Sequence, residues 1–141
     1  MRISARNQFR GVVKSVKKGA VNSDVIVDLG DGLEIFANIT NEAVGDLRLV
    51  AGRPAIALIK SSFVLLSPDP SVRTSARNRL TGIVSAVIPG AVNCEVKIEL
   101  PGARMLTAIV TTDAMNEMRL VKGGGCTALI KASHVMIGVD A

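Results

Sequence analysis

Cationic, hydroxyl and amide side chains recur at matching positions in the two halves of this 141-residue chain, 71 positions apart. The matches are Ser4 and Ser75, Arg6 and Arg77, Asn7 and Asn78, Asn22 and Asn93, Thr40 and Thr111, Arg48 and Arg119, Lys60 and Lys131, and Ser62 and Ser133. The set contains no carboxylate. Such side chains donate hydrogen bonds, and arginine and lysine add positive charge, which suits a small, fully deprotonated anion. The pattern therefore predicts that the chain binds an oxyanion.

A second recurring motif, Gly-Ala-Val-Asn, occupies residues 19–22 and 90–93. Glycine permits a tight turn, and successive backbone N–H groups in such a turn can bind an anion. Taken alone, the motif is more typical of an ordinary turn before a strand. Ser-Ala-Arg-Asn taken alone is likewise more typical of a strand that begins with a surface arginine. The joint retention of three polar clusters is what favours the anion.

Other recurring polar residues have simpler interpretations. Thr40 and Thr111 are predicted to be helix N-caps, because acidic residues follow in the first turn. Arg48 and Arg119 are interpreted as complementing the helix dipole, not as ligands. His134 stands where the first half has Phe63 and is therefore interpreted as a packing residue.

The repeat also defines the expected domains. Residues 1–67 and 72–141 each form one copy, and residues 68–71 lie in a proline-rich segment predicted to be a short, fairly stiff linker. Domains this small bury a low fraction of their surface and often depend on association.

Both copies predict the same order of elements. In the second copy, apolar residues alternate with charged ones over 94–100, which indicates a half-buried strand, and residues 25–29 show the same phase. Asp31-Gly32 and Pro101-Gly102 predict hairpin turns. A third strand, a short helix and two further strands follow in each copy. The predicted fold is all-β with short helices: two tandem five-stranded barrels of the OB type, each with one short helix.

Composition narrows the function. The net charge of +5 is compatible with nucleic acid or a small anion, but three Phe, no Trp and no Tyr make a poor stacking platform for bases. Cys94 and Cys126 lack a CxxC spacing and are predicted to be buried thiols. No metal-ligand spacing or catalytic motif is present, so we expect neither a metal site nor an enzyme. We expect a cytoplasmic location, because no signal-peptide core or membrane-spanning run is found.

The three motifs, in order and twice, resemble the molybdate- and tungstate-binding Mop family, in its two-domain molbindin form. The resemblance rests on Ser-Ala-Arg-Asn opening each copy, then Gly-Ala-Val-Asn, then Ile-Lys-Ser-Ser or Ile-Lys-Ala-Ser before Val. It implies an OB-type fold, a homotrimer, and storage or homeostasis of molybdate in the bacterial cytoplasm, with several oxyanions held between domains. Related regulators carry such domains fused to a DNA-binding helix-turn-helix; we see no such segment in these residues and therefore do not expect direct gene regulation.

The resemblance also implies the site residues. One class of site would use side chains and backbone of the first copy, facing a turn from a neighbouring domain: Ser4, Ala5, Arg6, Asn7, Thr40, Lys60, Ser61 and Ser62, with Ala20, Val21 and Asn22. The second copy supplies Ser75, Ala76, Arg77, Asn78, Thr111, Lys131, Ala132 and Ser133, with Ala91, Val92 and Asn93. Ala132 replaces Ser61, so we expect the two halves to bind with unequal affinity unless only the backbone matters there. The alternatives are an OB-type nucleic-acid-binding module and a scaffold whose repeated residues form an interface.

Overall fold

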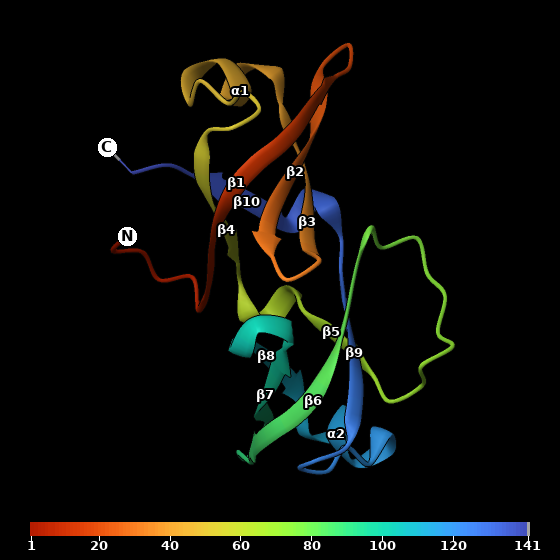
Figure 1. Cartoon of the computed structure of the whole chain (residues 1–141). Coiled ribbons are helices and arrows are strands. Elements are labelled where there is room, and N and C mark those ends of the chain that lie inside the picture. Colours follow the sequence, from red (N-terminus) through yellow and green to blue (C-terminus); the bar gives the residue numbers. More distant parts are fainter. Residues whose placement is uncertain (141) are drawn as a thin grey trace. The chain divides into compact units, whose positions relative to one another are not determined.

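A computed structural model describes residues 1–140, and its elements follow the predicted order in both copies (Figure 1). The first copy contains β1 (Asn7–Lys18), β2 (Asn22–Gly30), β3 (Leu33–Thr40), α1 (Asn41–Asp46), β4 (Pro54–Ile59), the short 3-10 helix η1 (Ser61–Phe63) and β5 (Leu65–Ser67). The second contains β6 (Asn78–Ile88), β7 (Asn93–Leu100), η2 (Pro101–Ala103), β8 (Arg104–Thr111), α2 (Thr112–Met118), β9 (Gly125–Ile130), η3 (Ala132–His134) and β10 (Val135–Gly138).

The core is built from the alternating apolar positions that the sequence indicated. Val25 and Val27 of β2, and Val96 and Ile98 of β7, are completely buried, while their neighbours along each strand are more exposed. Side chains of a strand point alternately to the two faces of a sheet, so one face of each sheet lines a core. The predicted all-β fold, with two OB-type five-stranded barrels and one short helix in each, is confirmed, and the five strands of each unit form one sheet.

The compact units do not coincide with the sequence repeats. Unit 1 comprises Met1–Ile59 together with the residues from Ala132 onward, and unit 2 comprises Lys60–Lys131. The strand order is β10-β4-β1-β2-β3 in unit 1 and β5-β9-β6-β7-β8 in unit 2. Each repeat therefore gives its fifth strand to the sheet that the other repeat builds.

The pairing of the two fifth strands shows this exchange. Val135 of β10 lies opposite Ile59 of β4, and Leu65 of β5 lies opposite Leu129 of β9. The boundaries predicted at 67 and 72 follow the repeats, whereas those of the compact units fall at 59/60 and 131/132. Residues 68–71, predicted to link two domains, instead lie inside unit 2, between β5 and β6. A repeat in sequence shows where each copy starts, but not which sheet its last strand joins.

The long first strand of each repeat, β1 or β6, pairs with two neighbours in succession. β1 pairs with β4 from Asn7 to Val12 and with β2 from Val12 to Lys18, with a register shift between Val13 and Ser15. Gly11 permits a close approach there, since a Cβ atom would lie 2.4 Å from the carbonyl oxygen of Asp28. A bulge and a glycine at this point let the strand bend and continue from one neighbour to the next.

The two helices begin as predicted and end on an unusual backbone conformation. The Thr40 Oγ1 accepts a hydrogen bond from the Ala43 amide at 3.1 Å, and Thr111 does the same for Ala114 at 3.1 Å. Arg48 and Arg119 follow the helices with φ angles of 52° and 53°. Their shared left-handed conformation is a feature of helix ends that the dipole interpretation did not anticipate.

Candidate functional site

The Ser-Ala-Arg-Asn motif lies at the start of β1, where the strand meets the end of β4. Asn7 is 1% exposed, and its Nδ2 donates a hydrogen bond to the carbonyl oxygen of Ile59 at 3.2 Å. Lys60 is the next residue along the chain. The second copy repeats this arrangement, with Asn78 1% exposed and 3.2 Å from the carbonyl oxygen of Ile130. The structure therefore joins the first and third motifs through a buried asparagine.

The exposed members of these two motifs are the cations and two serines. Arg6 and Lys60 are exposed, as are Ser4 and Ser62, whereas Ser61 is only 7% exposed. The Lys60 Nζ lies 5.5 Å from the ring centroid of Phe63, which restricts where the ammonium can go. The second copy has the same pattern of exposure at Ser75, Arg77, Lys131, buried Ala132 and Ser133.

The Gly-Ala-Val-Asn turn joins β1 to β2 and is attached to the start of α1. Asn22 lies opposite Thr40 in the β2–β3 ladder, and the Asn41 amide donates to the carbonyl oxygen of Val21 at 2.9 Å. Val21 is 73% exposed at the tip of the turn. Gly19 is required because a Cβ atom there would lie 2.6 Å from the carbonyl oxygen of Asn22.

Thr40 lies beside the Gly-Ala-Val-Asn turn, in a second cluster, and not beside Ser4, Arg6 and Lys60, with which the resemblance grouped it. Its hydroxyl accepts from the Ala43 amide as a helix cap and lies beside the turn. Thr111 is placed in the same way, opposite Asn93. The resemblance assigned these threonines to a site, but it did not indicate which end of the unit they occupy.

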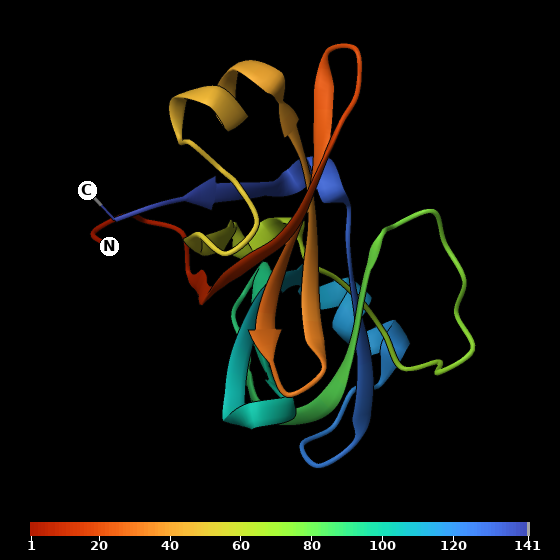
Figure 2. The same ribbon diagram turned by 45° about the horizontal axis from the view of Figure 1, so that its top comes forward.

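The two clusters of one unit lie far apart. Figures 1 and 2 show the start of β1 at one end of unit 1 and the β1–β2 turn, with α1, at the other. β1 has 12 residues, which at about 3.3 Å each would span roughly 40 Å if the strand were straight. One unit therefore does not bring its own turn to its own Ser-Ala-Arg-Asn motif.

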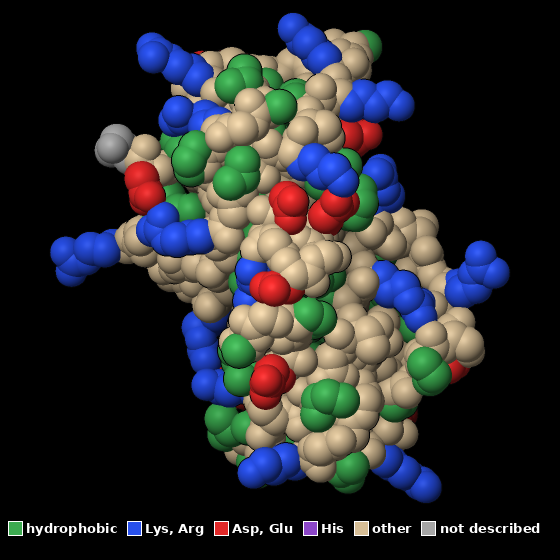
Figure 3. Space-filling model, viewed as in Figure 1, with side chains coloured by type: hydrophobic (Ala, Val, Ile, Leu, Met, Phe, Trp, Pro, Cys, Tyr) green, Lys and Arg blue, Asp and Glu red, His purple; other side chains and the backbone are tan. Residues whose placement is uncertain are grey.

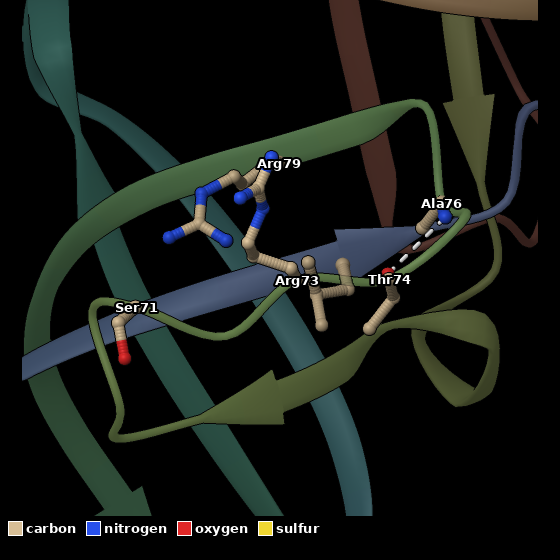
Figure 4. Close-up of a pocket in the computed structure, with 6 residues that line it drawn as sticks. Ser71, Arg73, Thr74, Ala76 and Arg79 are labelled. Atoms are coloured by element: carbon tan, nitrogen blue, oxygen red, sulfur yellow. Dashed lines mark hydrogen bonds between the residues drawn. The ribbon is translucent and has the colours of Figure 1, made fainter.

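Two further basic positions, which the sequence reasoning passed over, border the motif of the second copy. A cavity of about 430 Å³ is lined by Ser71, Arg73, Thr74, Ala76, Arg79 and Leu129. Figure 4 shows the Arg73 side chain extending from the loop toward Arg79. Arg79 donates hydrogen bonds to the carbonyl oxygens of Pro70 and Val72 and so holds this loop. Arg73 recurs as Arg2 in the first copy, and this match could have been found from the sequence.

Other chemistry is sparsely represented in the described part of the chain. Cys94 and Cys126 are buried free thiols, as predicted, and burial raises the pKa of Cys126. Residues 1–140 contain no group of three His, Cys, Asp or Glu side chains placed to hold a metal ion. No helix within the same range is both long and apolar enough to cross a membrane.

A family model for the TOBE domain matches the chain twice, over residues 3–66 and 74–137. The chain belongs to the TOBE-domain family. The two matches coincide with the two repeats and include every predicted site residue. The resemblance to the molybdate-binding Mop proteins is confirmed, because relatives with that name and with the name ModE match almost the whole chain.

Three proteins show what this TOBE protein is similar to. The molybdenum transport protein ModE of Azotobacter vinelandii is 40% identical over 139 residues, and the molybdenum-pterin-binding protein MopA of Rhodobacter capsulatus is 43% identical over 141 residues. Each alignment covers 99% of this chain but only 52% or 53% of the relative, so the chain spans about half their length. The cytoplasmic molybdate-binding protein ModG, in a crystal structure with molybdate bound, is 45% identical with a TM-score of 0.95, over 99% of this chain and 100% of ModG.

Proposed function

We propose that this TOBE protein binds molybdate, without catalysis, and serves in storage or homeostasis of the oxyanion in the cytoplasm. The observation that carries the proposal is the doubled set of donor side chains without a carboxylate, in a chain that matches molybdate-bound ModG over its full length. Tungstate has the same charge and tetrahedral shape, so we expect the same groups to accept it.

The proposed site combines the two clusters. Arg6 and Lys60 supply positive charge against an oxyanion of charge −2, and Ser4 and Ser62 supply neutral donors. The buried Asn7 keeps the start of β1 against the end of β4, so that its neighbours Arg6 and Lys60 stay at one end of the strand pair. A turn at residues 19–22 or 90–93 from a neighbouring domain adds backbone N–H groups. The second copy offers Ser75, Arg77, Lys131 and Ser133 in the same roles.

Association of several chains, as a trimer, is part of the proposal. Exposed apolar side chains recur at matching positions of the two copies: Val12 and Ile83, Val21 and Val92, Val50 and Val121, and Leu65 and Met136. An exposed apolar residue is ordinary when single, but sets of them indicate contact surfaces. Retention of apolar character at all four pairs supports burial against another copy.

Calorimetric titration with molybdate, tungstate and sulfate tests this function. We expect heat with molybdate and tungstate, and Arg6→Ala or Arg77→Ala should lower the affinity by about tenfold to a hundredfold, because a charge-assisted hydrogen bond contributes about 1.5–3 kcal/mol. Lys122→Ala is the matched control, since it removes an exposed cation at a position where the first copy has Ala51. No heat with molybdate from folded protein would disprove the proposal.

The alternative drawn from the sequence, an OB-type nucleic-acid-binding module, has less support. Figure 3 shows Lys and Arg side chains scattered over the visible face, with no single basic patch. Aromatic side chains for base stacking are limited to three Phe. Oligonucleotide binding that weakens steeply with salt would revive this alternative.

A further inference from the structure

The side chain of Asn41 ties together both ends of the first Gly-Ala-Val-Asn turn. Its Nδ2 donates a hydrogen bond to the carbonyl oxygen of Gly19 at 2.9 Å, and its Oδ1 accepts one from the Ser23 hydroxyl. Ser23 is completely buried. Together with the bond from the Asn41 amide to Val21 at 2.9 Å, one residue makes three contacts with the turn and its flanks.

Different residues make the corresponding contacts in the second turn. Thr112 stands at the position of Asn41, and its Oγ1 donates to the carbonyl oxygen of Gly90 at 3.1 Å. Cys94 replaces Ser23, and its Sγ lies 3.6 Å from the Thr112 Oγ1. The Thr112 amide still donates to Val92 at 2.9 Å. Both residues of this pair differ between the copies, yet in each copy they remain in contact with each other beside the turn. This indicates that the turn needs a side-chain partner.

The second turn is nevertheless held by weaker bonds. A thiol is a weak hydrogen-bond donor compared with the Ser23 hydroxyl. Pro89 stands where the first copy has Lys18, and because proline has no N–H, the last ladder pair of β1 and β2, Lys18 with Ser23, has no counterpart.

The closing hydrogen bond also differs between the turns. The Gly19 amide donates to the carbonyl oxygen of Asn22 at 2.9 Å. Within residues 1–140, no such bond joins Gly90 to Asn93. The first turn is thus fixed by its ladder, its closing bond and its Asn41 contacts, while the second depends mainly on Thr112.

The amide groups at the tips of both turns are available to a ligand. In the described chain, the N–H groups of Ala20 and Val21, and those of Ala91 and Val92, make no intramolecular hydrogen bond. We propose that Asn41 and Thr112 are positioning residues that hold these amides for an oxyanion, and that the more firmly held first turn binds it more tightly. This inference rests on the proposed function. A turn that is ordered before binding loses less conformational entropy when the anion arrives.

Molybdate calorimetry on the full-length chain and on matched variants tests the inference. We expect two classes of site. Asn41→Ala should weaken the tighter class by about threefold to tenfold, the worth of one neutral hydrogen bond, and leave the other class unchanged. Asn41→Thr should weaken it less, because the Thr112 hydroxyl already makes this contact in the second copy. Thr112→Ala should weaken only the second class.

A graft reverses the comparison. Pro89→Lys, Cys94→Ser and Thr112→Asn together give the second turn the partners of the first, and should bring the weaker class closer to the tighter one. Asn116→Ala, which removes an exposed amide from the same helix as Thr112, is the control and should change neither class.

The outcomes separate the two proposals. No molybdate binding by the unaltered protein would overturn the proposed function and this inference together. Binding by the unaltered protein with both affinities unchanged in Asn41→Ala would overturn the inference alone. Equal loss at both classes would show a general loss of folding and would also contradict a positioning role. If Asn41→Ala does not fold, Asn41→Thr and the graft still decide, because the second copy already folds with threonine there.

Discussion

Unit 1 and unit 2 have the same strand order but differ in how the chain supplies it. Unit 2 is one continuous segment, Lys60–Lys131, whereas unit 1 needs both the start and the end of the described chain. The chain passes from one unit to the other at 59/60 and again at 131/132. Lys60 and Lys131, the two predicted oxyanion-binding lysines, stand at these crossings. The segments that complete the two sheets therefore begin next to residues of the proposed site.

The sharpest test of this difference is deletion of everything after Lys131. Unit 1 would lose β10, and with it the buried side chains of Val135 and Ile137, which are 2% and 8% exposed. Burial of such side chains contributes about 1.5–3 kcal/mol each, which is large against the roughly 5–15 kcal/mol that stabilises a whole domain. We expect β2 amides of unit 1 to lose protection from hydrogen exchange while β7 amides of unit 2 keep theirs.

A shorter deletion provides the control for this experiment. Removal of the residues after Gly138 leaves β10 and its pairing with β4 intact, so both sets of amides should remain protected. Equal loss of protection in β2 and β7 after the longer deletion would show that the two units unfold as one. Full protection in both would show that β10 is dispensable.

The sequence predicted the strands and helices far better than it predicted which strands pair with each other. The alternation over 94–100 and the threonine caps correctly predicted strands and helix starts, because these features depend on residues that are close together in the sequence. The fifth strands, Leu65–Ser67 and Val135–Gly138, carry similar apolar patterns and could complete either sheet. Only the observed strand pairings, β10 with β4 and β5 with β9, show which sheet each one joins.

The site was predicted in part for the same reason. Identity between the copies drew attention to Arg6 and Lys60, which the structure places around the buried Asn7. Asn41 escaped notice because its counterpart is Thr112, so a search for identical residues misses it. The sequence does contain a paired difference: Ser23 and Asn41 in the first copy stand where the second copy has Cys94 and Thr112. Its meaning depends on the contacts between these side chains, which the sequence does not show.

Where the two units are most alike, matched substitutions should have equal effects. Asn7 and Asn78 are both 1% exposed, and each donates to a strand-end carbonyl at 3.2 Å. Alanine leaves that carbonyl buried without its partner, so Asn7→Ala and Asn78→Ala should each cost about 1–3 kcal/mol. Urea unfolding followed separately in β2 and β7 measures the two losses. A clearly larger loss in one unit would contradict the equivalence of the two asparagines.

The smallest expected effect concerns an ion pair between Arg10 and Asp140, which has no counterpart at the matching residues of the second copy. The Arg10 Nη1 donates to the Asp140 Oδ2 at 2.7 Å, which fastens the residues after β10 to β1. The matching residues of the second copy do not pair in this way, because Thr81 replaces Arg10 and Asp69 bonds Ser71 instead. Both members of the ion pair are well exposed, so solvent screens their attraction.

The hydrogen bond from Arg10, followed by its charge, lowers the pKa of Asp140. A lowered carboxyl pKa adds stability above the unfolded value of about 4 and loses it as the pH falls through the folded value. Asp140→Asn should therefore reduce the acid sensitivity of unit 1 slightly below pH 4, with little change at pH 7. The Asp69 pKa is also lowered, mainly by the Ser71 hydroxyl, so unit 2 has its own acid-sensitive group that the variant leaves untouched. Thermal unfolding between pH 7 and pH 2, followed in β2 and in β7, separates the response of unit 1 from that of unit 2. If the unfolding temperature of β2 depends on pH equally in Asp140→Asn and in the unaltered protein, the Arg10–Asp140 ion pair does not stabilise unit 1.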